Sequence, residues 1–238
     1  MFINHITALA ALFDCSPTLE GFSIELAAAR DLAVRTGNAL GFESLHTHRL
    51  LQALTGETGA AAMLDAVPEQ KVAVRPLSQF GLHCSCALAA LLFNDPPQLA
   101  RASAALMPLL SHVGGAYRCM TARLARAVSL AQDARLGRHE QSGTLPAEFH
   151  ALRDWFAERA ADAPANYKHL LHFIDAEAAW TTGAASAAVQ AFDLALQCCS
   201  AQTRPWHHAL IAERAGVFHL AHGLDYAGRA LLRDARER

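Results

Sequence analysis

The sequence predicts an all-α protein in which antiparallel helix hairpins stack on one another as an α-solenoid. Alanine and leucine dominate the composition, whereas Val, Ile, Thr and Tyr are few, and this balance favours helices over strands. Apolar residues recur with the helical period along most of the chain, and no segment alternates as a strand does. Two similar units follow each other near the C-terminus, and each contains a helix-ending glycine at the equivalent position, Gly183 in the first and Gly223 in the second. One hairpin cannot bury both of its faces, so the repetition predicts neighbours on each side.

Residues 1–75 are predicted to form the N-terminal hairpins. A short helix is expected over residues 2–13, and a longer one follows and closes at Gly37. The longer helix has an apolar stripe at i, i+4, i+7 and i+11, made of Phe22, Leu26, Ala29 and Ala33. Its partner helix is predicted over 40–55, before a short helix at 60–66 and a loop that ends at residue 75.

Residues 76–136 are predicted to form the middle hairpins. Asp95 and Pro96 indicate a capped helix start, with Asp as the N-cap and Pro at the first helical position. The helix over 97–110 should pair back on the preceding one, and a further helix should cover about 116–135. The polar segment LGRHEQSGTLP that follows predicts an exposed loop.

Residues 146–238 contain the best-defined repeats, after a helix predicted over 146–162. In the first unit Ala188, Phe192 and Ala195 follow the glycine turn, and Ala-x3-Phe after such a turn is part of the tetratricopeptide pattern. The period from Gly183 to Gly223 exceeds the usual ~34 residues, and Trp and Tyr are absent from their consensus positions. We therefore predict tetratricopeptide-like repeats rather than consensus ones.

Small residues and apolar stripes predict how these helices pack. Ala176 and Gly216 are expected where repeat helices pass closest, and Gly183 and Gly223 as left-handed residues just past helix ends. The stripes predicted to face each other are Val189, Phe192, Leu196 and Cys199 on one helix and Phe173, Ala176 and Trp180 on the other. The full set of predicted repeat positions is Ala176, Gly183, Ala188, Phe192, Ala195, Glu213, Gly216, Phe218 and Gly223.

Three segments carry a resemblance to a known family: Leu50–Gly59, Pro164–Gly183 and Ala209–Arg236. Each is similar to a stretch of the helical-repeat region of very large bacterial signalling proteins. These proteins combine a Ser/Thr kinase-like domain, an AAA-type ATPase, tetratricopeptide-like repeats, a GAF domain and a histidine kinase. In the third segment the matching positions are Glu213, Phe218, Gly223 and Arg236. The kinase-like, ATPase, GAF and histidine-kinase domains have no counterpart in these residues. The resemblance therefore implies a fragment of such a protein, or a gene without its catalytic parts.

Charge, hydropathy and cysteine usage exclude several classes of function. The formal net charge is −2 and no basic stripe is visible, which argues against nucleic acid as a partner. The sequence contains no stretch of 18 or more apolar residues, so we predict no membrane insertion. The six cysteines show neither Cys-x-x-Cys nor a disulfide framework, so we expect reduced thiols and a cytoplasmic protein.

No catalytic motif is visible in the sequence. It contains no Walker loop, no Gly-x-Gly-x-x-Gly, no His-Arg-Asp or Asp-Phe-Gly kinase signature and no Gly-x-Ser-x-Gly. We therefore predict no enzymatic activity, no catalytic residues and no cofactor for this chain.

Histidine is the one unusual count, at 13. His169 with His172, and His219 with His222, stand at i, i+3, so each pair could share a helix face and supply weak candidate ligands for a metal such as Zn²⁺. The residues near them in sequence are His207, His208 and Glu213. A full set of ligands with supporting carboxylates cannot be placed, so the sequence predicts surface or half-buried repeat positions and no metal site.

Three functions follow from these observations. The first is a non-catalytic scaffold of a bacterial signalling ATPase/kinase, which relays or gates signals between flanking domains or binds a regulatory protein. The second is a free-standing adaptor that holds a partner peptide or helix, for which Lys, Arg or Asn along the first helices of successive repeats would be evidence. The third is a metal-dependent helical enzyme that uses the histidine pairs.

Overall fold

The structure is a computed structural model, which describes residues 2–38, 45, 48, 76–114, 117–137, 144–200 and 204–237. The helices predicted over 40–55 and 60–66, the loop to residue 75 and the family-like segment Leu50–Gly59 lie outside the described residues. The chain divides into two compact units, residues 1–125 and 126–238, and the boundary falls within one helix. Each unit is described by itself below.

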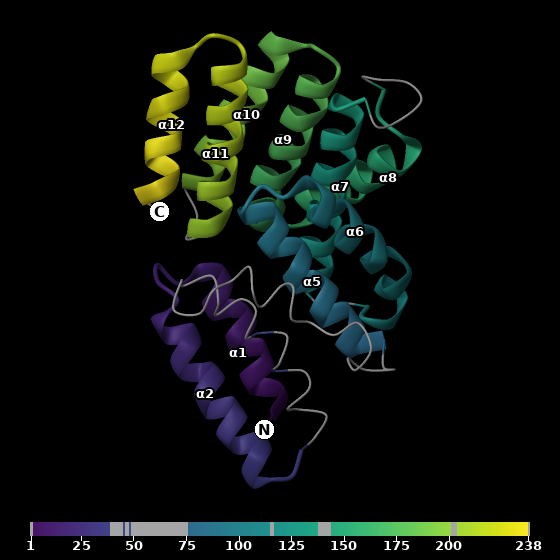
Figure 1. Cartoon of the computed structure of the whole chain (residues 1–238), viewed down its shortest axis with the longest axis vertical. Coiled ribbons are helices and arrows are strands. Elements are labelled where there is room, and N and C mark those ends of the chain that lie inside the picture. The colour runs from purple at the N-terminus through teal and green to yellow at the C-terminus, as the bar shows by residue number, and fades with distance from the viewer. Residues whose placement is uncertain are drawn as a thin grey trace. The chain divides into compact units, whose positions relative to one another are not determined.

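The described residues form helices and contain no strand, which confirms the predicted all-α class (Figure 1). The helices are α1 (Phe2–Cys15), α2 (Glu20–Arg35), α5 (Pro76–Leu92), α6 (Pro96–Leu106), the 3-10 helix η2 (Met107–His112), α7 (Arg118–Arg135), α8 (Ala147–Asp162), α9 (Pro164–Thr181), α10 (Ala185–Ser200), α11 (Pro205–Ala221) and α12 (Asp225–Glu237).

Unit 1 packs α1 against α2 and α5 against α6. All four residues of the predicted α2 stripe, from Phe22 to Ala33, are buried. The Asp95 carboxylate accepts a hydrogen bond of 3.1 Å from the Gln98 backbone N–H, so the predicted N-cap is confirmed. The helix predicted over 97–110 instead ends at Leu106 and continues as η2, because Pro108 has no N–H to donate to a carbonyl four residues earlier.

Unit 2 contains two hairpins whose glycines behave as predicted. Gly183, between α9 and α10, and Gly223, between α11 and α12, both have φ 74°, the left-handed conformation that favours glycine. The N–H groups of Ala184 and Leu224 then donate to carbonyls five residues earlier, at 2.8 and 2.9 Å. The two turns, one repeat apart, therefore close their hairpins in the same way.

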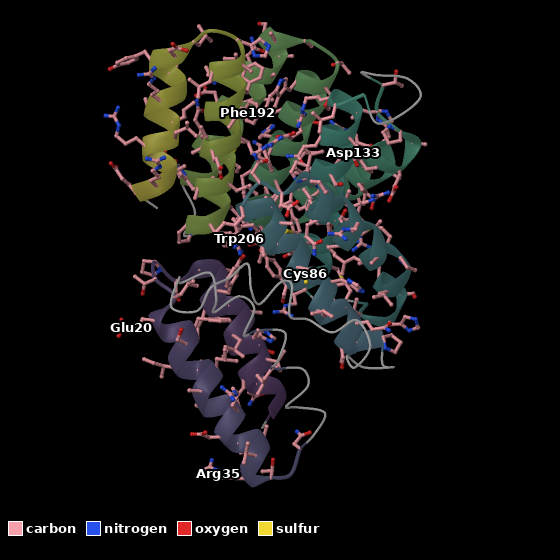
Figure 2. The ribbon with its side chains drawn as sticks, in the orientation of Figure 1. Glu20, Arg35, Cys86, Asp133, Phe192 and Trp206 are labelled. Atoms are coloured by element: carbon pink, nitrogen blue, oxygen red, sulfur yellow. The ribbon has the colours of Figure 1, made fainter. Side chains whose placement is uncertain are left out.

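The buried stripe of α10 lies one residue away from the predicted one at two of its positions. Ala188, Phe192, Ala195 and Cys199 are buried, whereas Val189 is 37% exposed and Leu196 is half-buried. The predicted stripe is therefore wrong at Val189 and Leu196, whereas Ala188 and Ala195, which were predicted as repeat positions, are buried. Phe192 lies among α9, α10 and α11, with its ring 6.4 Å from that of Phe173 and 5.5 Å from that of Phe218 (Figure 2).

The α11/α12 hairpin depends on a pair of glycines. A Cβ on Gly216 would lie 2.9 Å from Leu232 Cγ and 3.0 Å from the Gly228 carbonyl oxygen. A Cβ on Gly228 would lie 2.7 Å from Leu220 Cγ and 2.9 Å from the Gly216 carbonyl oxygen. The close approach predicted at Gly216 is confirmed, and Gly228 is the partner that the sequence prediction missed. Ala176 and Ala188, the counterparts in the preceding hairpin, are both fully buried.

Candidate functional site: a buried ion cluster across three helices

The candidate site begins with Glu177, an acidic residue on the apolar face of α9. Its neighbours Phe173, Ile174 and Ala176 are fully buried, and the Glu177 side chain is only 1% exposed. A carboxylate in such a position is costly unless it is paired with a cation and hydrogen-bonded. Glu177 has these partners on both sides.

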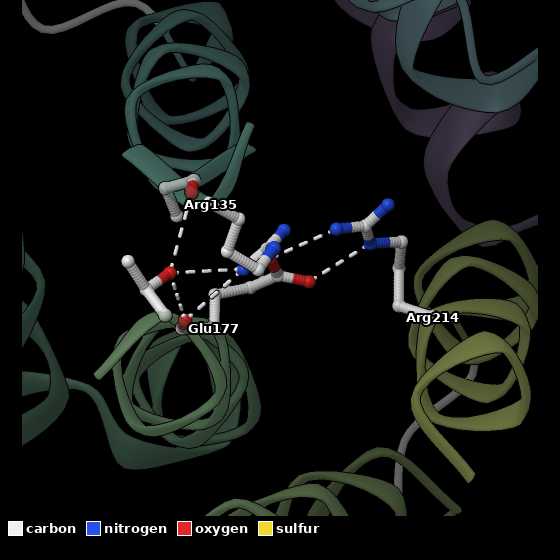
Figure 3. A network of polar contacts seen from close by, with 5 residues as sticks. Arg135, Glu177 and Arg214 are labelled. Atoms are coloured by element: carbon white, nitrogen blue, oxygen red, sulfur yellow. Dashed lines mark hydrogen bonds and ion pairs between the residues drawn. The ribbon is translucent and has the colours of Figure 1, made fainter. Parts of the chain in front are cut away.

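Two arginines from neighbouring helices hold the Glu177 carboxylate (Figure 3). Arg214 of α11 donates from Nε to Oε1 at 2.8 Å and from Nη2 to Oε2 at 2.9 Å, a bidentate pair. Arg135 of α7 donates from Nη2 to Oε2 at 2.6 Å. The side chains of Arg135 and Arg214 are 14% and 9% exposed, so both ion pairs are largely shielded from water.

Thr181 completes the group, which we call the Glu177 cluster: Arg135, Glu177, Thr181 and Arg214. Arg135 Nη1 donates to the Thr181 hydroxyl oxygen at 3.0 Å and to the Glu177 backbone carbonyl at 3.2 Å. The Thr181 hydroxyl donates to the Glu177 carbonyl at 2.8 Å and lies 3.3 Å from the carbonyl oxygen of Ala131 in α7. The contacts from α7 to α9 thus involve backbone as well as side-chain atoms.

Trp180 lies against the same guanidinium groups. Arg135 Cζ is 4.2 Å from the centre of its ring and Arg214 Cζ is 5.3 Å from it, distances typical of cation–π contacts. The Trp180 ring also meets Phe218 edge-on at 5.5 Å. Trp180, predicted as part of a facing apolar stripe, is half-buried and contacts the two arginines as well as the core.

The electrostatics of the cluster keep Glu177 ionised. Burial alone would raise the pKa of Glu177, but the charges of Arg214 and Arg135 and their hydrogen bonds outweigh burial and lower this pKa to about 2. Burial lowers the pKa of Arg135, and Glu177 opposes that shift. With one carboxylate between two guanidiniums, the cluster has a surplus of one positive charge.

A second polar contact joins α9 to α11 through two histidines, which we call the histidine pair. His169 Nε2 lies 2.8 Å from His207 Nδ1, and both residues are buried. Burial lowers the pKa of His169 to about 4. Burial, helped by the charges of His169 and Arg204, also lowers the pKa of His207 well below 6.5.

The structure does not bring the predicted metal candidates together. His169 contacts His207 rather than His172, which is half-buried and has a pKa lowered by burial. His219 and His222 each place Nδ1 at 2.7–2.8 Å from the backbone carbonyl four residues earlier, so each ring N–H donates within its own helix. Within the described residues, no three His, Cys, Asp or Glu side chains form a group that could hold a metal ion.

The remaining predicted repeat positions on α11 are buried or half-buried. Phe218 is buried, and Glu213 is half-buried with a pKa raised by burial. His208, beside the histidine pair, contacts Asp234 of α12 at 2.7 Å.

Sequence reasoning missed Arg135, Glu177 and Arg214. A signal was present, because Glu177 and Arg214 stand inside apolar helix faces with opposite charges, 37 residues apart.

Comparison of the chain with family models, with curated proteins and with solved structures finds no match. None of the described helices is long and apolar enough to cross a membrane. The functional argument therefore depends on the geometry above.

Proposed function

We propose that this chain is a non-catalytic, tetratricopeptide-like helical scaffold that relays or gates signals between domains or proteins attached to it. The observation behind this proposal is the Glu177 cluster. One carboxylate on α9 is bonded to Arg135 on α7 and to Arg214 on α11. A displacement of α11 therefore changes the contacts of α9, and through Glu177 those of α7.

The stacking of the α9/α10 and α11/α12 hairpins supports the solenoid arrangement that the repeats predict. Consecutive helices pack on one another from α8 to α12, and α12 lies at the outer end of unit 2 (Figure 1). In solenoids each repeat contacts mainly its neighbours, so a change at one end reaches the other through successive interfaces. A cluster that joins α7, α9 and α11 makes this coupling stronger.

The adaptor hypothesis finds less support in the same helices. Cationic and amide residues do lie along α9 and α11 and just before α11, as an adaptor would need, but several of them are bonded to other side chains of the chain. Arg204 donates to the Asn166 side chain at 2.9 Å, and Arg214 is bonded to Glu177. A peptide ligand would have to replace these contacts, whereas in a scaffold the same contacts hold neighbouring helices together.

Hydrogen exchange measured by mass spectrometry on the Arg214→Met variant tests the relay. Removing one partner of a buried ion pair costs about 3–5 kcal/mol, so we expect exchange to rise about tenfold or more in α11, in α9 and in residues 126–135 of α7. The matched control is Arg229→Met on the exposed side of α12, which should leave all three helices unchanged. A rise that stays confined to α11 and α12 would contradict the relay.

The family context suggested by the resemblance, a kinase or ATPase that contains these repeats, is part of the proposal. The mass of the native protein in its source cells tests it, by mass spectrometry of endogenously tagged material. A species several times heavier than 25.5 kDa is expected. A native species of 25.5 kDa would overturn the internal-segment proposal and favour a free-standing adaptor.

A further inference from the structure

The histidine pair joins two hairpins through a hydrogen bond that is lost when both rings are protonated. His169 lies on α9 and His207 in the first turn of α11, with their rings 5.0 Å apart between centres and inclined at 34°. In the contact of 2.8 Å one ring nitrogen donates and the other must keep its lone pair. If both rings were protonated, two cations would face each other in the interior and neither could accept.

We propose that the histidine pair is an acid-sensitive joint, at which the α11/α12 hairpin loosens from α9 when the pH falls while the Glu177 cluster stays intact. This inference concerns the regulation of the proposed relay, but it depends only on the contacts of the pair. The relay and the acid-sensitive joint can be overturned independently, because the relay is tested at constant pH with Arg214→Met whereas the joint is tested by changing the pH.

The charged groups around the pair offer little compensation for an added proton. On the α11 side Arg204 is a cation that opposes protonation of His207, and His208 already contacts Asp234 of α12. On α9 the charges of Lys168 and Asp175 act on the pKa of His172, and Asp175 accepts a hydrogen bond of 2.9 Å from Arg153 of α8. From the α10 side, the Cys199 thiol lies 3.9 Å from the Arg204 carbonyl oxygen.

The pKa values give the direction of the response. An unfolded or opened histidine titrates near 6.5, whereas in the closed structure the pKa of His169 is about 4 and that of His207 is also lowered. The open state therefore binds more protons between pH 6.5 and about 4, so stability is complete above pH 6.5 and decreases as the pH falls through this range. Each histidine raises the equilibrium constant for opening by up to about tenfold per pH unit, and the pair by up to about a hundredfold.

The Glu177 cluster responds in a different range. The pKa of Glu177 is lowered to about 2, so its contribution is present above pH 4.5 and decreases only below that value. Between pH 6.5 and 4.5 acid therefore weakens the histidine pair and leaves the Glu177 cluster charged and bonded.

The test is hydrogen exchange in α11 (Pro205–Ala221) from pH 7 to pH 4.5, corrected for the intrinsic pH dependence of exchange. In the unmodified protein we expect the opening constant of α11 to rise by up to about a hundredfold per pH unit below 6.5. The double variant His169→Gln/His207→Gln has side chains that donate and accept without titrating, and it should lose this dependence. The single variant His172→Gln, on the same helix but outside the pair, should retain it.

Equal pH dependence in the unmodified protein and the double glutamine variant would overturn the proposal. If the double variant does not fold, an NMR titration of the histidine rings in the unmodified protein decides the matter. Both rings should remain neutral well below pH 6.5, because burial lowers the pKa of His169 and of His207. Titration of both paired rings near 6.5 without any change in α11 would also overturn it.

Discussion

The α9/α10 and α11/α12 hairpins have the same turn geometry and follow each other as successive repeats, yet they are built differently. The first places alanines, Ala176 and Ala188, where the second places glycines, Gly216 and Gly228. At the position of Glu177 in the first hairpin, the second has Val217, which is 37% exposed. In the second hairpin α11 buries nine residues, whereas α12 buries only Gly228 among its described residues.

The difference shows what a charged residue needs in order to be tolerated inside such a stack. Glu177 lies between two helices that each supply an arginine, and both pairs are shielded from water. At Val217 the side chain is partly exposed on the helix next to the outer end of unit 2. The glycines meet another need, since they let α12 approach α11 closely enough to form a hairpin although α12 itself buries very little.

The largest expected effect on the free energy of unfolding comes from exchanging the residue types at positions 177 and 217. Glu177→Val leaves two buried guanidiniums without their carboxylate and should lower the free energy of unfolding by about 3–5 kcal/mol. Val217→Glu, the reverse change at the equivalent position of the next repeat, should alter it by no more than ~0.5 kcal/mol because the side chain reaches solvent. Urea unfolding measures both. Similar losses in the two variants would show that Glu177 is not paired as described.

Acid titration of stability tests whether Glu177 is ionised and paired in the first hairpin. Because the pKa of Glu177 is lowered from 4.5 to about 2, its ionisation stabilises the folded state above pH 4.5, and this contribution of roughly 3 kcal/mol is lost as the pH falls to 2. The triple variant Arg135→Met/Glu177→Leu/Arg214→Met removes the whole cluster, so it should lack this loss and keep about the stability of the unmodified protein at pH 7. Comparison of the two stability curves between pH 4.5 and 2 is the measurement. Parallel curves would contradict the prediction.

The smallest expected effect concerns the glycine pair. Gly228→Val places side-chain atoms against Leu220 and the Gly216 carbonyl oxygen, and such overpacking costs about 1–3 kcal/mol. Ala230→Val, on the exposed side of α12, makes a similar β-branched change without that contact and should cost no more than ~0.7 kcal/mol. Thermal unfolding of both variants separates the two costs. Equal shifts would mean that the close approach of α11 and α12 contributes nothing.

Part of the site could have been predicted from the sequence. Glu177 and Arg214 interrupt apolar faces, and a charge in such a place requires a partner of opposite sign about one repeat away. Arg135 could not be assigned in this way, because its helix has several other arginines and only the packing of α7 on α9 selects one. The tetratricopeptide pattern indicated the buried Ala188 and Ala195, whereas hydropathy alone selected Val189 and Leu196 and was wrong at these two positions.

The sequence by itself determined the helical class, the positions of the glycine turns and the Asp95 cap, because these follow from propensities and backbone conformations within a few residues. The tertiary structure decided which side chains meet. Residues 37–42 positions apart in sequence became neighbours in the Glu177 cluster and in the histidine pair. These contacts depend on the angle and distance between packed helices, which are set by the fit of all side chains between them.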